Sequence, residues 1–566
     1  MKVKAESISN KEISRAFKLA ASLLELHDDN PFKARSMQNA AFKLERLPSP
    51  ISTMSEDEIA QLDGIGKSIQ GKIQEYIDHS SFDELDNLLD KTPPGIVEML
   101  AIKGIGPKKV RVLWKDLGVE SPGELLYACN ENRLVELKGF GTKTQDLIRK
   151  SIEFKQSNSG KFLYAPVESI ALQLERDIKQ SGLITNFSFT GALRRKCEII
   201  ERLELIVSTT DEKAFNEFIR EHPLLEEKTI EEEKNELKAT IAGQLALTIH
   251  LASEENFMSS LFYSTGSEKH LEILKNNFGW KENQTVNSEE GIYTALELPY
   301  IEPELREGLF EFELAKKKSM PVLVTEKDLK GILHNHSTYS DGEHSLEEMA
   351  VYCKELGYEY LGICDHSKSA FYANGLQPER IEKQHAEIDQ LNKKLNPFKI
   401  FKGIESDILV DGSLDYPDSI LKTFDFIVAS VHSILRMDKE KATKRLITAI
   451  ENPYTSILGH PTGRLLLARE GYPIDYTKVI DACAANGVVI ELNANPYRLD
   501  LDWRYLQEAL NKNVMISINP DAHRKEGFND MHYGVCVARK GGLTSEMTFN
   551  SLSLEKISSY FLSRKK

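Results

Sequence analysis

Beyond residue 330 the chain alternates short apolar runs with helical patterns, and the runs end in polar side chains. Seven runs follow one another: 331–337, 360–367, 399–408, 424–433, 455–463, 488–496 and 514–523. Six of them finish in a histidine or carboxylate that could bind a metal ion, and the run at 488–496 finishes in Asn493 and Asn495. Strands that alternate with helices predict a (β/α) barrel, in which the strand ends meet at one face.

Nine side chains make up the predicted cluster at that face. They are His334, His336, Asp341, His366, Glu405, His432, His460, Asp521 and His523. A single histidine at a strand end is more often an ordinary polar residue, but nine potential ligands on six of the seven strand ends make that explanation improbable. Imidazole and carboxylate without thiolate suit Mn²⁺ or Zn²⁺, with Fe²⁺ as a further candidate.

Length and composition limit the class of protein. At 566 residues the chain should divide into several domains. No apolar run approaches the roughly 18 residues that span a membrane, and the N-terminus lacks the apolar core of a signal peptide. The six cysteines form no CxxC pair, which argues against a disulfide framework or a thiolate zinc site. We therefore expect a cytoplasmic protein without a membrane partner.

The charge distribution excludes a nonspecific nucleic-acid coat. Residues 1–150 hold 22 Lys and Arg against 23 Asp and Glu, a net of −1, so the remainder carries −14 of the total of −15. Any DNA binding must then be local, through placed lysines and backbone amides.

Such placed groups occur in three similar segments, 62–73, 100–113 and 134–148. Each has a helical pattern, a Gly-x-Gly turn and lysines in the first turn of a second helix, where an unpaired helix end favours an anion. The residues are Gly64, Gly66 and Lys67; Gly104, Gly106, Lys108 and Lys109; and Gly139, Gly141 and Lys143. One copy could be a mere interhelical turn, but three copies resemble the helix-hairpin-helix motif, which holds the DNA backbone.

Nearly the whole chain resembles the bacterial family X DNA polymerases. Besides the hairpins, the segments 262–270 (FYSTGSEKH) and 296–308 (LELPYIEPELREG) are typical of that family. In some members the small N-terminal domain, here 1–90, carries a lyase lysine, whose position falls on Lys72. An ordinary surface lysine is the alternative, and Arg35 is a weak candidate for binding a 5′-phosphate there.

The palm motif of this family departs from its pattern here. Gly191, Arg194 and Arg195 match, but the two metal-binding aspartates of the motif fall on Arg202 and Glu204. The third aspartate falls on Thr248, and no acidic residue lies between positions 236 and 254. Nucleotide transfer needs two divalent ions held by these acids. We therefore expect a degenerate nucleotide site and loss of polymerase activity.

The barrel motifs LHNHSTYSDG, CDHS, GIES, VHS, GHPTGR and PDAH resemble the polymerase-and-histidinol-phosphatase (PHP) domain fused to these polymerases. The resemblance implies three metal ions. Their ligand sets would be His334, His336, Glu405 and Asp521; Glu405, His432 and His460; and Asp341, His366 and His523. Metal ions activate a water for attack on a phosphoester. Arg464 is a candidate catalytic clamp on the phosphate, and Arg498 a weaker one.

The expected protein is thus multi-domain. A helical lyase-like DNA-binding domain at 1–90 precedes a fingers-like hairpin domain at 91–155. An α+β palm-like domain at 156–255 and a thumb-like domain at 256–318 then lead to a distorted (β/α)7 PHP barrel at 330–566.

We expect a monomeric 3′–5′ exonuclease for gapped, nicked or 3′-ended DNA, with abasic sites and 3′-phosphates as further substrates. It would act beside another polymerase or ligase of base-excision repair. The alternatives are a still-active gap-filling polymerase, a small-molecule phosphatase of the histidinol-phosphatase type and a non-enzymatic scaffold that binds DNA ends.

Overall fold

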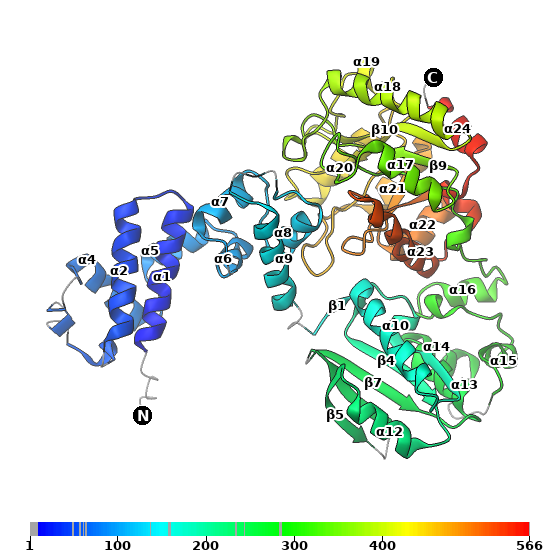
Figure 1. Cartoon of the computed structure of the whole chain (residues 1–566), viewed down its shortest axis with the longest axis horizontal. Coiled ribbons are helices and arrows are strands. Elements are labelled where there is room, and N and C mark those ends of the chain that lie inside the picture. Colours follow the sequence, from blue (N-terminus) through cyan, green and yellow to red (C-terminus); the bar gives the residue numbers. More distant parts are fainter. Residues whose placement is uncertain are drawn as a thin grey trace. The chain divides into compact units, whose positions relative to one another are not determined.

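The computed structural model describes residues 9–47, 50–55, 58–59, 61–62, 65–102, 104–135, 137, 139–156, 160–231, 235–242, 244–281 and 286–564. The chain forms two compact units, residues 1–153 and 154–566 (Figure 1). The first unit is helical, and the second contains both sheets of four or more strands. No described helix is long and apolar enough to cross a membrane. All six cysteines are free thiols, as their spacing predicts.

Short helices build the first unit, in the order α1 (Asn10–Leu26), α2 (Pro31–Arg46), η1 (Ile51–Thr53), α4 (Lys67–His79), α5 (Asp83–Asp90), α6 (Pro94–Leu100), α7 (Pro107–Lys115), α8 (Pro122–Asn130) and α9 (Thr142–Gln156). A capping box at Ser9 begins α1, and Asn30 caps α2. The predicted helix–glycine turn–helix arrangement is confirmed at the second hairpin, where α6 and α7 flank the turn. At the third, α9 follows the glycines, but residues 131–135 before them form turns rather than a helix. Gly104 and Gly139 have φ of 97° and 90°, which an L side chain rarely adopts.

The palm-like region of the second unit is built on a five-stranded sheet. Its elements are β1 (Phe162–Leu163), α10 (Tyr164–Gln180), β2 (Asn186–Phe189), α11 (Gly191–Arg194), β3 (Ile199–Ile200), β4 (Arg202–Ser208), α12 (Glu212–Glu221), β5 (Leu225–Glu231), β6 (Glu236–Ile241) and β7 (Leu245–Leu251). The strand order is β2-β4-β7-β6-β5, and β4 and β7 are parallel. Apolar residues of β4, β6, β7 and α10 form its core.

Helices follow this sheet and lead to the barrel: α13 (Phe257–Thr265), α14 (Glu268–Phe278), α15 (Glu289–Ala295), η4 (Pro303–Leu305), α16 (Glu311–Lys316) and η5 (Glu326–Asp328). Their core contains Phe262, Trp280 and Tyr293. Arg306 is fully buried there, because Glu289 pairs with its guanidinium.

Seven parallel strands form the predicted barrel: β8 (Gly331–Ile332), β9 (Tyr360–Ile363), β10 (Lys399–Asp407), β11 (Phe426–Ser430), β12 (Ile457–Leu458), β13 (Val489–Asn493) and β14 (Ile516–Asn519). They pair in sequence order, and an isolated parallel bridge between Asn335 and Ala522 brings the two edges together. The predicted (β/α)7 barrel is therefore confirmed.

Helices surround these strands (Figure 1): α17 (Leu346–Glu355), η6 (Phe371–Ala373), α18 (Pro378–Leu395), α19 (Asp418–Leu421), α20 (Lys439–Ile450), α21 (Tyr476–Asn486), η7 (Trp503–Tyr505), α22 (Leu506–Asn511), η8 (Lys525–Asp530), α23 (Met531–Lys540), η9 (Ser545–Met547), η10 (Phe549–Ser551) and α24 (Leu554–Ser563).

The barrel interior is apolar at one end and polar at the other. Alternation along β10 puts Phe401 and Glu405 on the inner side, whereas Ile400 and Ile404 join the outer core with the helices. Phe561 of α24 stacks on Phe426 with ring centroids 4.8 Å apart. The C-terminal helix thus packs against the apolar part of the interior, which leaves the opposite, C-terminal strand ends for polar groups.

Buried polar contacts join the palm-like region to the barrel. Lys540 of α23 is 1% exposed, pairs with Glu307 and donates to the backbone oxygen of Arg195 at 3.0 Å. The indole of Trp503 donates to Glu198 at 3.1 Å. Because a buried charge is costly unless it is paired, these contacts fix the two regions as one unit.

Candidate metal centre

Glu405, near the C-terminal end of β10, lies at the centre of the predicted cluster. Its Oε1 is 3.2 Å from Nε2 of His334, 3.1 Å from Nε2 of His432 and 3.0 Å from Nε2 of His460. Its Oε2 is 2.9 Å from Nδ1 of His366. One buried carboxylate therefore meets imidazoles from four other strand ends.

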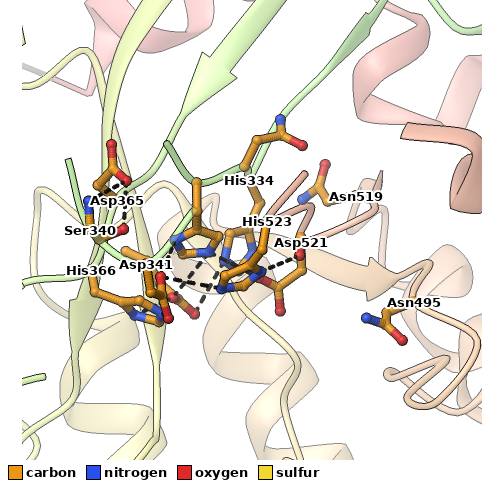
Figure 2. Close-up of polar contacts among 12 residues, drawn as sticks. His334, Ser340, Asp341, Asp365, His366, Asn495, Asn519, Asp521 and His523 are labelled. Atoms are coloured by element: carbon orange, nitrogen blue, oxygen red, sulfur yellow. Dashed lines mark hydrogen bonds and ion pairs between the residues drawn. The ribbon is translucent and has the colours of Figure 1, made fainter. Parts of the chain in front are cut away.

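The remaining donors lie beside these histidines, and Figure 2 shows Asp341, Asp521 and His523 gathered around His334 and His366. Oδ1 of Asp521 lies 2.9 Å from Nε2 of His336. Oδ1 of Asp341 lies 3.4 Å from Nε2 of His523, and its Oδ2 lies 3.6 Å from Nε2 of His366. All nine side chains therefore meet at the C-terminal face of the barrel.

Within residues 331–564, donor atoms that lie within 4.8 Å of one another form three groups. The groups are His336, Asp341, His366 and His523; His334, His336 and Asp521; and His366, Glu405 and His432. They resemble the three ligand sets expected from the sequence. They differ from those sets in that His336 also joins the Asp341 group, and in that His366, rather than His460, joins Glu405 and His432. Glu405 is not part of the group formed by His334, His336 and Asp521.

The donor atoms fit a bound cation. Among the described residues, Nε2 of His334 and both ring nitrogens of His366 are buried and lack an aligned hydrogen bond, although carboxylate oxygens lie 2.9 to 3.6 Å away. Buried polar atoms normally have a partner, so lone pairs that converge without bonding one another suit a metal. Burial and the facing rings of His523 and His366 lower the pKa of His336 to about 3. His336 is therefore neutral, as a metal ligand must be.

Two of the nine residues have strained backbones. His334 has φ of 57° and Asp521 has φ of 53°. They flank the bridge between Asn335 and Ala522 that closes the barrel. Such conformations are unfavourable for non-glycine residues and concentrate at functional sites. Here the strain coincides with side chains that turn into the cluster.

Sequence reasoning missed two carboxylates that orient the histidines. Oδ1 of Asp407 lies 2.5 Å from Nδ1 of His432, and Oε2 of Glu491 lies 2.6 Å from Nδ1 of His334. Glu491 also accepts the backbone N–H of His460 at 3.0 Å. Such partners fix the tautomer and direction of a metal-binding imidazole. The available signal was an acidic residue inside the otherwise apolar run VVIELN.

Replacing Glu491 tests this orienting role. Glu491→Gln keeps the shape of the side chain but removes the charge that holds His334, so we expect metal affinity to fall about 10- to 100-fold. Calorimetric titration of the metal-stripped protein with Mn²⁺ measures the change. Glu555→Gln, an exposed position on α24, should leave the affinity unaltered. Equal affinities for Glu491→Gln and wild type would contradict the role.

Asp365 holds the loop that carries Asp341. Its Oδ1 accepts the backbone N–H of Ser337 at 2.8 Å and the hydroxyl of Ser340 at 2.5 Å (Figure 2). Its Oδ2 accepts from Gln384 at 2.6 Å. Asp365 is fully buried and is satisfied by these donors, so it supports the site from behind the cluster.

The two candidate phosphate clamps lie in different surroundings. The guanidinium of Arg464 donates to the backbone oxygens of Arg498 and Leu499 and pairs with Asp502 at 2.6 Å. Arg464 therefore braces the 498–502 loop. Nε of Arg498 lies 3.8 Å from Oδ2 of Asp521. Arg498, the weaker candidate in the sequence, therefore lies beside the cluster.

The hairpin residues lie at exposed helix starts of the first unit. Lys67, Lys108 and Lys143 are exposed in the first turns of α4, α7 and α9. Lys109 lies over the ring of Phe140 at 5.4 Å. A Cβ placed on Gly66, Gly104, Gly106, Gly139 or Gly141 would meet no atom within 4 Å, so a phosphate has room to approach these turns. Gly64 lies outside the described residues.

Lys72 has an ionic partner. Its Nζ lies 3.3 Å from Glu84 and donates to the hydroxyl of Ser68 at 3.0 Å. A lyase nucleophile must be free to attack its substrate, whereas this amine is engaged in an ion pair and a hydrogen bond. Arg35 is exposed on α2. This geometry favours the surface-lysine alternative over a lyase nucleophile.

The three positions where the palm motif of the family has an acid lie on neighbouring strands, and only Glu204 among them is a carboxylate. Glu204 on β4 pairs in register with Thr248 on β7, and Arg202 pairs with Ala246. His250 is an ionisable neighbour of Glu204, and its Nε2 lies 3.9 Å from that carboxylate. The sheet thus presents one acid where the family pattern has three.

The palm arginines are engaged inside the protein. Arg194 pairs with Glu289 at 2.5 Å and donates to Thr265 at 2.7 Å. Arg195 pairs with Glu307 at 2.9 Å, the same carboxylate that holds Lys540. Gly191 packs against Glu204, because a Cβ there would come within 2.0 Å of Oε2. These contacts stabilise the fold of the palm and its junction with the barrel.

Comparisons with known proteins agree with this architecture. Residues 8–82 match a helix-hairpin-helix domain, residues 96–153 a SAM-like helix-hairpin-helix tandem, and residues 333–495 the PHP domain. The chain is similar to the DNA polymerase/3′-5′ exonuclease PolX of Bacillus subtilis, with 36% identity over 97% of this chain and 99% of that protein. A probable phosphatase of Thermoanaerobacter sp. is 29% identical over 37% of this chain and 91% of its own length.

Hairpin repeats, a palm and a PHP barrel in one chain define the class of X-family DNA polymerase homologues that contain a PHP domain. Identity over nearly both full lengths makes the assignment more specific. The chain belongs to the PolX family.

Proposed function

We propose that this protein is a metal-dependent 3′–5′ DNA exonuclease and 3′-end phosphoesterase that clears DNA ends during repair. The observation that supports this most directly is the convergence of nine imidazole and carboxylate groups at one barrel face. Helix-hairpin-helix regions in the same chain favour DNA as substrate over a small phosphoester. Abasic sites and 3′-phosphates are further substrates under this proposal.

The nine residues would hold three divalent ions, with Mn²⁺ or Zn²⁺ favoured and Fe²⁺ as a further candidate. His334, His336, Glu405 and Asp521 would hold one ion, Glu405, His432 and His460 a second, and Asp341, His366 and His523 a third. Bound ions of this kind activate a water and neutralise charge on the phosphoester. Glu491 and Asp407 would hold the Nδ1 protons of His334 and His432, so that the Nε2 atoms of these rings face the metal. Arg498 is the candidate cation for the phosphate.

The palm would have no polymerase activity under this proposal. Glu204 is the only carboxylate at the three expected positions, and a guanidinium at position 202 repels a divalent ion by several kcal/mol even at an effective dielectric constant of about 20. The palm would instead stabilise the barrel through the contacts of Glu307 with Lys540 and of Glu198 with Trp503. Lys72, which pairs with Glu84, would have no lyase activity.

Metal removal tests the proposed reaction. We expect a 3′-ended oligonucleotide to be shortened from its 3′ end with Mn²⁺, and to remain intact after chelation of the ions. Readdition of Mn²⁺ should restore the reaction, as read on a denaturing gel with the 5′ end labelled. Shortening that continues in excess chelator would refute metal dependence.

Metal affinity should rise with pH. Burial opposes protonation of His432, but the carboxylates of Glu405 and Asp407 outweigh it and raise the pKa of the metal-free protein's His432 to about 9. A metal ion needs the neutral imidazole, so binding must expel a proton below that pH. We expect affinity for Mn²⁺ to increase by up to about tenfold per pH unit between neutrality and about pH 9. Calorimetry in buffers of different ionisation enthalpy measures the released protons, and no release at neutral pH would contradict the assignment.

A small-molecule phosphatase is the second candidate. It is favoured by relatives named probable phosphatases, which align with 37% and 34% of this chain. Hydrolysis of a small phosphomonoester without hydrolysis of DNA would support it.

For the exonuclease we propose a monomer in the cytoplasm, acting on gapped, nicked or 3′-ended DNA beside another polymerase or ligase of base-excision repair.

A further inference from the structure

Four exposed apolar side chains stand on successive loops at the C-terminal face of the barrel. Phe371 is 81% exposed, Val410 66%, Ile434 59% and Leu467 38%. They follow β9, β10, β11 and β12 in that order, and each comes two to seven residues after the predicted metal ligand of its strand. We call these four residues the apolar rim. Leu356 and Leu562 are the other exposed large apolar residues within 331–564.

Two members of the rim have unfavourable backbones. Ile434 has φ of 53° and Leu467 has φ of 59°. This region is poor for any L side chain and is exceptional for a β-branched residue such as isoleucine. Exposure of an apolar side chain on a strained backbone offers no benefit to folding. Such a combination indicates that the side chain contacts a molecule that binds at this surface.

The loops of the rim are held rigidly. Arg445 is 3% exposed and donates to the backbone oxygens of Leu409 at 2.9 Å and Ser433 at 3.0 Å. These residues directly precede Val410 and Ile434. One buried guanidinium therefore joins two neighbouring loops, so that Val410 and Ile434 are positioned before anything binds them.

The rim adjoins the metal centre. Tyr372, next to Phe371, has its ring centroid 6.4 Å from that of His366. The loops after β11 and β12 also touch, because a Cβ on Gly463 would lie 3.8 Å from the side chain of Leu435. A strand of DNA that reaches the metal centre across these loops would therefore contact the rim.

Cationic residues accompany the rim on three of its four loops. Lys368 lies three residues before Phe371, and Arg436 and Arg469 each lie two residues after an apolar member. The fourth loop carries Asp411, whose carboxylate accepts from Ser413 in its own turn at 2.7 Å. Apolar side chains interleaved with cations complement nucleobases joined by phosphates.

We propose that the apolar rim binds the unstacked nucleobases at the 3′ end of the strand that the metal centre hydrolyses. The proposal rests on the proposed exonuclease function and assigns residues to its substrate contacts. Every base has an apolar face, so stacking on Phe371 and contact with the aliphatic members would be independent of sequence. The flanking cations would pair with the phosphates.

Two rim variants and two substrates test the proposal. Phe371→Ala removes the aromatic ring, and Ile434→Gly removes a side chain from a backbone that glycine adopts without strain. Each variant is assayed on a single-stranded oligonucleotide and on the same oligonucleotide with abasic tetrahydrofuran residues at its 3′ end. We expect KM for the natural strand to rise about tenfold, and kcat/KM for the abasic strand to stay within about twofold. Leu356→Ala, an exposed apolar position on the same barrel, should alter neither value.

A hydrolysis-independent readout separates this proposal from the proposed function. An oligonucleotide with 5-iodouracil at its 3′ end should photo-cross-link to the segment 368–372 in the metal-stripped protein. Equal loss on both substrates, no loss on either, or cross-links elsewhere would overturn the rim assignment. Wild-type protein that cross-links at 368–372 but does not shorten DNA would support the rim and refute the exonuclease.

Discussion

Glu405→Gln should reduce DNA hydrolysis by about three orders of magnitude or more. Glu405 is, among the residues that the structure describes, the one carboxylate within about 3 Å of four histidines, and it belongs to two of the three proposed ligand sets. Glutamine has nearly the same shape but no charge, so the ions would lose their shared ligand. The rate of 3′ shortening with Mn²⁺ measures the effect.

The same variant should retain its affinity for DNA within a few-fold, since the hairpins that would bind the backbone lie in the other unit of the chain. Glu382→Gln replaces an exposed carboxylate on α18 of the same barrel and should hydrolyse DNA at the wild-type rate. Unchanged hydrolysis by Glu405→Gln, with its fold confirmed by circular dichroism, would discredit the proposed centre.

A primer on a gapped template should shorten with Mn²⁺ whether or not nucleotides are present. The palm has one acid at its three expected positions, and its two arginines already pair with Glu289 and Glu307. The Glu405→Gln variant makes the test stricter, because degradation can no longer hide extension. We expect that variant to leave the primer at its original length.

Extension of the primer would contradict our interpretation of the palm. It would mean that Glu204 binds a metal with other partners, and the structure limits the choice. Nδ1 of His250 lies 3.3 Å from Glu236, while its Nε2 lies 3.9 Å from Glu204. Glu204→Ala would then abolish extension.

Arg194 and Arg195 have a structural role in the palm that does not depend on the metal-binding acids of the family motif. Arg195 shares Glu307 with Lys540 of the barrel, and Arg194 shares Glu289 with the fully buried Arg306. Loss of either palm arginine would leave a buried carboxylate with fewer cations, which is strongly destabilising. Their presence in the sequence is therefore a weak sign of nucleotide binding.

The barrel and the composition of its polar face could be predicted from the pattern of residues along the chain. Alternating strand and helix patterns allow few topologies, and a parallel barrel brings its strand ends together wherever they occur in the chain. Donors as distant in sequence as His334 and Asp521 could thus be grouped from their positions alone. Glycines with positive φ likewise marked the hairpin turns, because local sterics decide them.

The tertiary structure alone decided which groups assist and which are already engaged. Arg464 and Glu491 each have a type of side chain that can serve several roles, and only their partners distinguish them. Arg464 meets the 498–502 loop, whereas Glu491 orients His334. The exposure of Phe371 and the strain at Ile434 also depend on loop packing. Hydrogen bonds and burial between distant segments have no periodic signature in a sequence, so these assignments required the folded chain.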